Sequence, residues 1–227
     1  ALFEGNRLIE HWRTEKLLPA DLEKIASSYS IDAAIYCSVA TRGEEIIVSL
    51  RSFVQRVYEM TSMLPLPIKI CYATPTTLGR DRIAAVAGAY AAHPGCDVLV
   101  VDAGTAVTYD RLTADGEFAG GNIAPGLWVR AKSLHDMTQR LPLVDVENNM
   151  PASLWGNDTD NAIISGVVYG IVGETGYYRS RMPDGALVML TGGDAQHLAS
   201  LMDFKVEVDP DLVSKGLNSI LLYNENI

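Results

Sequence analysis

Apolar and polar positions follow a regular order along the second half of the chain. Three short apolar or alternating runs come first, which is the pattern of neighbouring β-strands, and a helical spacing of apolar residues follows them. Strands are predicted over residues 97–102, 105–111, 117–123, 186–190 and 205–208, and helices over 127–139, 160–182, 196–202 and 212–223. Strands that alternate with helices in this way predict a layered α/β unit.

The first half shows a shorter version of the same order. It opens within a hairpin over residues 1–12 that turns at Gly5 and Asn6, so we expect a preceding strand to pair with this hairpin. Helices are predicted over 18–29, 44–60 and 80–92, and strands over 33–39 and 68–72. The two similar halves predict a duplicated, two-lobed protein, with a first lobe over residues 1–95 and a second over 96–227.

Composition and charge narrow the possible functions. Of 227 residues, 48% are apolar and 20% are charged, as in ordinary globular proteins, and no apolar run reaches the roughly 18 residues of a membrane helix. We therefore expect a soluble, cytoplasmic protein. The net charge of −10 argues against nucleic acid as a ligand, because basic surfaces bind phosphate backbones.

Cysteine and histidine give no sign of a metal site in the sequence. Cys37, Cys71 and Cys96 are an odd number without a C-x-x-C pair, and each lies in or beside an apolar segment, so we interpret them as reduced core thiols. The four histidines are scattered without the spacing of metal ligands, which argues against zinc.

The turn after the first strand of the second half is one candidate for chemistry. Asp102 provides a carboxylate, Gly104 lets a ligand approach the backbone closely, and Thr105 provides a hydroxyl. This combination suits phosphate and a metal ion. The same residues also suit an ordinary β-turn. A second glycine turn, with Gly192 and Gly193, follows a later strand. The two turns could hold one nucleotide at the strand ends, or the second could be a plain loop.

A carboxylate at a helix N-terminus is the other candidate. Asp81 follows Gly79 at the start of the helix predicted over 80–92, where free backbone N–H groups stabilise an anion; helix capping alone is its alternative role. Walker A, Rossmann and nucleophile-elbow motifs are absent from the sequence. Phosphoryl transfer needs charge neutralisation, positioning and a base for the acceptor hydroxyl. Asp102 with a cation, the threonine turns and Asp81 could meet these needs.

Four stretches together are similar to one known family. They are Gly-Arg-Asp-Arg at residues 79–82, Asp-Ala-Gly-Thr-Ala-Val-Thr at 102–108, Gly-Gly-Asn-Ile-Ala-Pro-Gly at 120–126, and Thr159 with Ser165 and Gly166. Their order and spacing resemble type III pantothenate kinases over nearly the whole chain. The resemblance implies a two-lobed, duplicated α/β fold of the actin/ribonuclease H-like class, which Hsp70 and the sugar and acetate kinases share. It also implies a homodimer that uses ATP to phosphorylate pantothenate to 4′-phosphopantothenate, the first step of coenzyme A synthesis.

The resemblance also implies roles for individual residues. Asp81 is the expected general base, and Asp102 is the expected ligand of a monovalent cation, K⁺ or NH₄⁺. ATP is expected to bring Mg²⁺ with its phosphates, and Arg82 suits the pantothenate carboxylate. The expected pantothenate contacts are Tyr72, Gly79, Arg80, Asp81, Arg82 and, across the dimer, Thr159. The expected ATP contacts are Gly104, Thr105, Thr108, Gly192 and Gly193.

The sequence departs from the family pattern in two places. Relatives begin with a strand and an Asp-x-Gly-Asn-Thr loop that cradles ATP phosphates, and this sequence starts just after that point. A chain without the loop is expected to be inactive, although the full-length protein need not be. Residues 37–41 read Cys-Ser-Val-Ala-Thr where relatives usually have Ser-Ser-Val-Val-Pro, and we expect this to change the loop geometry rather than the chemistry.

Two other functions compete with pantothenate phosphorylation. One is a regulatory, non-catalytic homologue that acts as a transcription accessory factor, and the other is a different small-molecule kinase of the same superfamily. The presence of Asp81 and Asp102 and the acidic net charge argue against the first. The Gly-Arg-Asp-Arg stretch at residues 79–82 argues against the second.

Overall fold

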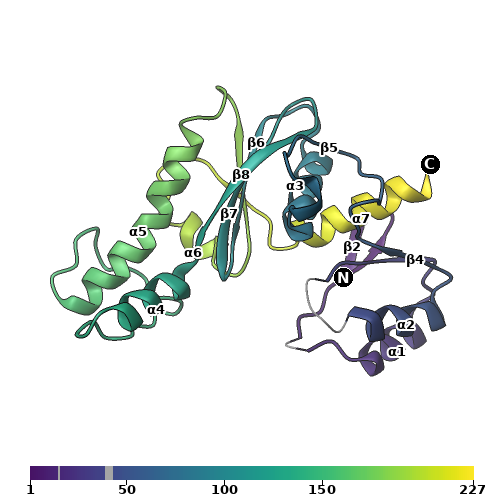
Figure 1. Cartoon of the computed structure of the whole chain (residues 1–227), viewed down its shortest axis with the longest axis horizontal. Coiled ribbons are helices and arrows are strands. Elements are labelled where there is room, and N and C mark those ends of the chain that lie inside the picture. The colour runs from purple at the N-terminus through teal and green to yellow at the C-terminus, as the bar shows by residue number, and fades with distance from the viewer. Residues whose placement is uncertain (15, 39–42) are drawn as a thin grey trace.

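A six-stranded sheet lies at the centre of the second half of the chain (Figure 1). The computed structural model describes residues 1–14, 16–38 and 43–227. The strand order is β10-β9-β6-β7-β8-β5. The strands are β5 (Lys69–Ile70), β6 (Val98–Ala103), β7 (Ala106–Leu112), β8 (Glu117–Pro125), β9 (Leu187–Thr191) and β10 (Glu207–Val208). β7 runs antiparallel to both β6 and β8. β9 runs parallel to β6, and β10 runs parallel to β9.

Helices cover both faces of this sheet. Figure 1 shows α4 (Leu127–Met137) and α5 (Thr159–Arg179) on one side, and α3 (Arg80–Ala92) and α7 (Leu212–Glu225) on the other. Alternate residues of a strand point to opposite faces, so Leu99 and Val101 of β6 pack in the core with α4, α5 and α6 (Ala195–Ala199). Val98 and Val100 pack in the core with α3 and α7. β6 is buried on both faces, which explains its continuous apolar run.

The helices α3 and α7 approach each other closely at two glycines. A β-carbon at Gly216 would collide with the carbonyl oxygen of Ala84, and one at Gly88 would collide with the carbonyl oxygen of Leu212. Because glycine has no β-carbon, the two backbones can pack in direct contact. The glycines thus determine the distance between α7 and α3.

The first half forms two separate two-stranded sheets. β1 (Leu2–Glu4) and β2 (Arg7–Glu10) form an antiparallel hairpin, whereas β3 (Ala33–Tyr36) and β4 (Arg56–Glu59) are parallel. The accompanying helices are α1 (Pro19–Ser28), α2 (Gly43–Phe53) and the 3₁₀ turn η1 (Pro75–Thr77). The end of α7 contacts this half: Glu225 accepts a hydrogen bond from the Tyr58 hydroxyl and pairs with Arg56 at 2.6 Å.

The repeated order predicted from the sequence is confirmed. Each half carries antiparallel strands followed by parallel strands with intervening helices, and the second half begins with the three predicted strands and the helix after them. The first-half hairpin turns at Gly5, with φ of 58°. None of the described helices is both long enough and apolar enough to cross a membrane. The proposed lobe boundary at residue 95 stays a prediction, because α3 and β5 pack with the second half.

The helix predicted over 44–60 is wrong in its second part. The helix α2 ends at Phe53, and β4 follows it, with Val57 opposite Ala34 and Tyr58 opposite Ile35 in the parallel pair. Pairing with β3 therefore outweighs the helical spacing of the apolar residues. Of the stretch at 37–41 that departs from the family pattern, residues 39–41 lie outside the described part of the chain, and so does the end of the strand predicted over 33–39.

Candidate active site

A row of polar side chains crosses three strands at the carboxyl end of β6. Asp102 of β6 lies opposite Thr108 of the antiparallel strand β7 and opposite Thr191 of the parallel strand β9. Opposed residues share one face of a sheet, and two residues further back Val100 and Met189 belong to the core under α3 and α7. The row therefore faces the side of the sheet that α3 covers.

The first turn of α3 carries the predicted base. Asp81 is exposed there, and its Oδ1 accepts a hydrogen bond of 2.9 Å from the backbone N–H of Arg82. Gly79 is the N-cap residue, and a β-carbon on it would lie 2.6 Å from Asp81 Oδ1. The missing side chain at Gly79 thus leaves room for the Asp81 carboxylate. The negative charge of Asp81 contributes to a raised pKa of Asp102.

Asp102 is a carboxylate with an unusual electrostatic environment. Burial, the charge of Asp81 and the charge of Asp110 raise its pKa to about 6. Thr108 lies opposite Asp102 in the ladder, its Oγ1 is buried, and its side chain interacts with the Asp110 carboxylate. A partly buried carboxylate beside a threonine hydroxyl oxygen fits a cation. The described residues contain no group of three or more His, Cys, Asp or Glu side chains that could hold a metal ion, so the ligand oxygens of a nucleotide would have to complete such a site.

Arg82 forms a buried ion pair with Asp110 of β7. Its Nε donates to Oδ1 at 3.0 Å and to Oδ2 at 3.2 Å, and its Nη2 donates to Oδ1. Only 6% of the Arg82 side chain and none of Asp110 is exposed. The Arg82 guanidinium also lies 6.0 Å from the ring centre of Tyr72 and 5.7 Å from that of Phe118. Burial raises the pKa of Asp110, and the Arg82 guanidinium acts in the opposite direction.

The two glycine turns lie in contact at the strand ends. Gly192 has φ of 93°, and a β-carbon on it would collide with the carbonyl oxygen of Ala103 and lie 2.6 Å from Asp102 Oδ1. The N–H of Asp194 donates to the same carbonyl oxygen at 3.1 Å. Thr105 and Gly193 are exposed. The turns after β6 and β9 thus form one edge where a ligand can approach the backbone closely.

The predicted residue Thr159 lies in another part of the molecule. It begins α5, on the opposite side of the sheet from α3, as Figure 1 shows for the two helices. There it lines a groove of about 550 Å³ between α4 and α5, together with Arg130, Leu134 and Gly166. The structure therefore brings Tyr72, Arg80, Asp81, Arg82 and Asp102 to one region but does not bring Thr159 to Asp81 within one chain.

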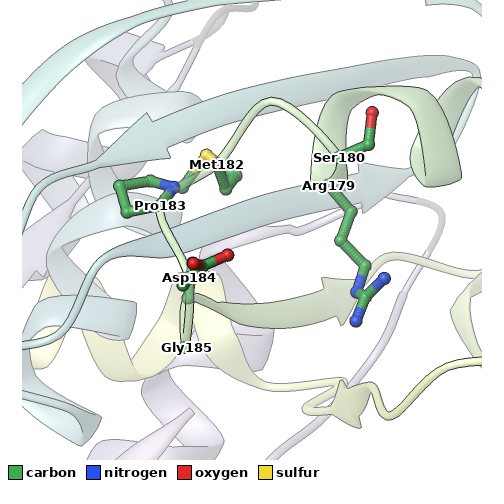
Figure 2. A pocket seen from close by; sticks show the side chains of 7 residues that line it. Arg179, Ser180, Met182, Pro183, Asp184 and Gly185 are labelled. Atoms are coloured by element: carbon green, nitrogen blue, oxygen red, sulfur yellow. The ribbon is translucent and has the colours of Figure 1, made fainter.

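A small cavity of about 160 Å³ lies between the end of α5 and β9. Figure 2 shows its lining, which includes Arg179, Ser180 and Asp184. The Arg179 guanidinium lies 4.7 Å from the ring centre of Phe204. None of the predicted site residues lines this cavity, so we do not assign it to the active site.

Asp110 and Gly121 are the site residues that the sequence reasoning missed. Gly121 lies opposite Asp110, and a β-carbon on it would collide with Asp110 Oδ1 and lie 2.7 Å from Arg82 Nη2. One signal was present in the sequence. The charged residue Asp110 lies two positions before Leu112, on the same face of β7, and Leu112 is a core residue. A buried charge needs a partner, and Arg82 supplies it from 28 residues earlier in the chain.

A pH-dependent stability is expected from the raised pKa of Asp102. The folded protein keeps this carboxyl protonated up to about pH 6, whereas the ordinary pKa is 3.8, so the Asp102 contribution to the free energy of unfolding falls as pH rises from 4 to 6. The Asp102→Asn variant carries a neutral amide at this position, which does not titrate. Near pH 4 the two proteins should be similar in stability, and at pH 7 the variant should be more stable by about 2 kcal/mol. Urea unfolding without nucleotide or K⁺ measures this; a difference that does not change with pH would contradict it.

Comparison with known proteins identifies the family. Residues 1–180 match the family model described as type III pantothenate kinase. A type III pantothenate kinase of Porphyromonas gingivalis is 42% identical over 89% of this chain and 84% of its own, and one of Bacteroides fragilis is 41% identical over 99% and 93%. A solved structure titled as a conserved putative Baf family transcriptional activator from Campylobacter jejuni shares the fold, with a TM-score of 0.60, 23% identity, and coverage of 91% and 89%. The chain thus belongs to the type III pantothenate kinase family.

Proposed function

We propose that the protein transfers the terminal phosphoryl group of ATP to pantothenate and forms 4′-phosphopantothenate, the first step of coenzyme A synthesis. The observation that supports this best is the exposed Asp81 carboxylate at the N-terminus of α3, whose charge acts on Asp102 beside the glycine turn at Gly192. A carboxylate next to a phosphate-binding edge is what transfer to an alcohol requires. We also propose that the reaction takes place in the cytoplasm.

Asp81 is the proposed general base. The N–H of Arg82 and the positive end of the α3 dipole stabilise negative charge on its carboxylate, so it can accept the proton of the pantothenate primary hydroxyl. Its exposure leaves it accessible to the substrate. The hydroxyl oxygen can then attack the terminal phosphorus as the proton leaves, the bond from this phosphorus to the bridging oxygen breaks, and ADP departs with its electron pair.

The two turns at the strand ends are the proposed ATP site. Gly104, Thr105 and Thr108 would contact the phosphates, and Gly192 and Gly193 would lie under the adenosine. Mg²⁺ bound to ATP would neutralise phosphate charge, and Asp102 with Thr108 would hold K⁺ or NH₄⁺ beside the phosphates. The raised pKa of Asp102 and the position of Thr108 opposite it in the ladder support this assignment.

Pantothenate is proposed to bind along the residues before and at the start of α3. Tyr72 and Gly79 border this region, and two guanidinium groups are available for the substrate carboxylate. Arg82 already donates to Asp110 through Nε and Nη2, which leaves it fewer donors for the substrate. Arg80 is half-buried beside the same turn, and we assign the carboxylate contact to Arg80 first.

A homodimer is proposed because no side chain of the described residues fills the α4–α5 groove. The groove contains Thr159 and Gly166, and a β-carbon on Gly166 would have no neighbour within 4 Å. Large apolar side chains are exposed on the segments beside it, including Met137 at 84% and Trp155 at 82%. A second copy that covers this groove would bury these side chains and bring its own Thr159 toward a pantothenate site across the dimer.

Gly166→Trp tests the dimer. The indole has room in a monomer but would occupy the groove, so we expect a monomer that keeps its fold and loses at least tenfold in kcat/KM for pantothenate, because Thr159 no longer reaches the partner's site. Sedimentation velocity and circular dichroism measure the two properties. Lys205→Trp, at an exposed position before β10, is the matched control and should remain a dimer. A monomeric but fully active wild type would contradict the proposal.

An assay of the full-length protein tests the function. ATP, pantothenate, Mg²⁺ and K⁺ are supplied, and 4′-phosphopantothenate is detected by mass spectrometry. Product that depends on pantothenate supports the proposal, and its absence rejects it. Parallel reactions with acetate and hexoses test the other small-molecule kinases, and replacement of K⁺ by Na⁺ with an unchanged rate would remove the cation assignment.

A further inference from the structure

The Arg82–Asp110 pair connects the helix of the proposed base to the sheet. Arg82 directly follows Asp81 in α3, and Asp110 lies in β7 between Val100 of β6 and Gly121 of β8. Val100 belongs to the core under α3, so Asp110 places a charge at the border of an apolar layer. Both side chains are almost completely buried.

Stability alone does not explain a charged pair at this position. Burying two charges costs several kcal/mol, and well-packed apolar residues of similar size often stabilise a protein equally well. On this face of the sheet Asp110 has the apolar neighbours Val100 and Leu112, and most of the buried face of α3 is apolar as well, whereas Thr108 is its polar neighbour. An ion pair does provide direction, because a carboxylate that accepts from two donors of a planar guanidinium fixes both its position and its rotation.

The surroundings leave the pair little freedom. Arg82 Nε bonds both carboxylate oxygens, and Nη2 bonds Oδ1 as well. The rings of Tyr72 and Phe118 lie about the guanidinium, and Gly121 lies so close that even a β-carbon would collide with Asp110. Because consecutive Cα atoms are about 3.8 Å apart, a displacement of Arg82 would displace Asp81 by a similar amount.

We infer that Asp110 is a positioning residue for phosphoryl transfer: it acts through Arg82 to hold the first turn of α3, and with it the Asp81 carboxylate, over the Asp102 edge of the sheet. The inference rests on the proposed function, in which Asp81 is the base. A misplacement of about 1 Å at a reacting group can cost on the order of 10²-fold in rate, so a precise support for Asp81 has a large kinetic value.

The test is a comparison of kcat and KM in the full-length protein. Asp110→Asn keeps the size of the side chain but removes its charge and one acceptor, and we expect kcat to fall on the order of 10²-fold while KM for ATP changes less than about twofold. Asp115→Asn, an exposed carboxylate in the turn after β7, is the matched control and should keep its kcat. A kcat of Asp110→Asn within about threefold of wild type would overturn the inference.

A second comparison separates positioning from general damage. In an Asp81→Asn background the further change Asp110→Asn should lower kcat less than about threefold, because a support has no effect once the base is gone. A full additional loss would show that Asp110 acts independently of Asp81, and would also overturn the inference. If Asp110→Asn does not fold, Asp110→Glu keeps the charge but changes the reach of the carboxylate toward Arg82, and it should show the same dependence on Asp81. If the wild type forms no product, the proposed function fails instead.

Discussion

Asp81→Asn is expected to lower kcat for pantothenate phosphorylation by on the order of 10³-fold, with KM for ATP nearly unchanged. Asparagine has the same shape and can still accept the hydrogen bond from the N–H of Arg82, which is 2.9 Å long in the wild type. It cannot accept the proton of the substrate hydroxyl. Initial rates of 4′-phosphopantothenate formation at saturating ATP measure the effect.

An aspartate in another helix provides the control for Asp81. Asp21 lies in the first turn of α1, and its Oδ2 accepts a hydrogen bond of 2.9 Å from the N–H of Leu18. Asp21→Asn should cost about 1 kcal/mol of stability or less and leave kcat unchanged. If Asp81→Asn behaves in the same way and keeps near-wild-type turnover, Asp81 only caps α3 and is not the base.

Gly216→Ala is expected to destabilise the protein by about 3 kcal/mol, at the upper end of the usual cost of overpacking. The added methyl group would collide with the carbonyl oxygen of Ala84, which is backbone and cannot rotate away, so α7 must move from α3. For a chain of 227 residues this corresponds to a fall in Tm of about 6–12 °C. Thermal unfolding followed by circular dichroism measures it.

A second position on α7 provides the control for Gly216. Ser219→Ala adds no carbon atom and changes a half-buried position of the same helix, so Tm should move by less than about 2 °C. If Gly216→Ala also changes Tm by less than about 2 °C, then α3 and α7 can move apart at little cost in free energy.

Much of the fold could be predicted because its elements have strong local patterns. β6 is a continuous apolar run, and α3 was predicted with the bounds that the structure has. The residues of β4 show why other parts could not be predicted. Val54 and Val57 have helical spacing, but Val57 belongs to a strand because Ala34 of β3 lies beside it, and no pattern near Val57 reveals that partner.

The candidate site divides in the same way. Asp81 and Asp102 could be picked out because each stands at the terminus of a predicted element, two residues from a glycine, where a carboxylate can meet a ligand. How they lie relative to each other depends on how α3 packs on the sheet, and the local sequence pattern does not predict this packing. Asp110 was missed for this reason: its significance depends on Arg82, which is 28 residues earlier in the chain.

The last turn of α7 has a consequence for how the protein is made. Tyr58 and Glu225 are bonded across 167 residues, and Asn224 donates to the carbonyl oxygen of Pro65 across 159. During synthesis the strands β3 and β4 leave the ribosome well before the helix α7 that contacts them. The first half of the chain must therefore wait, without this support, until α7 has been made.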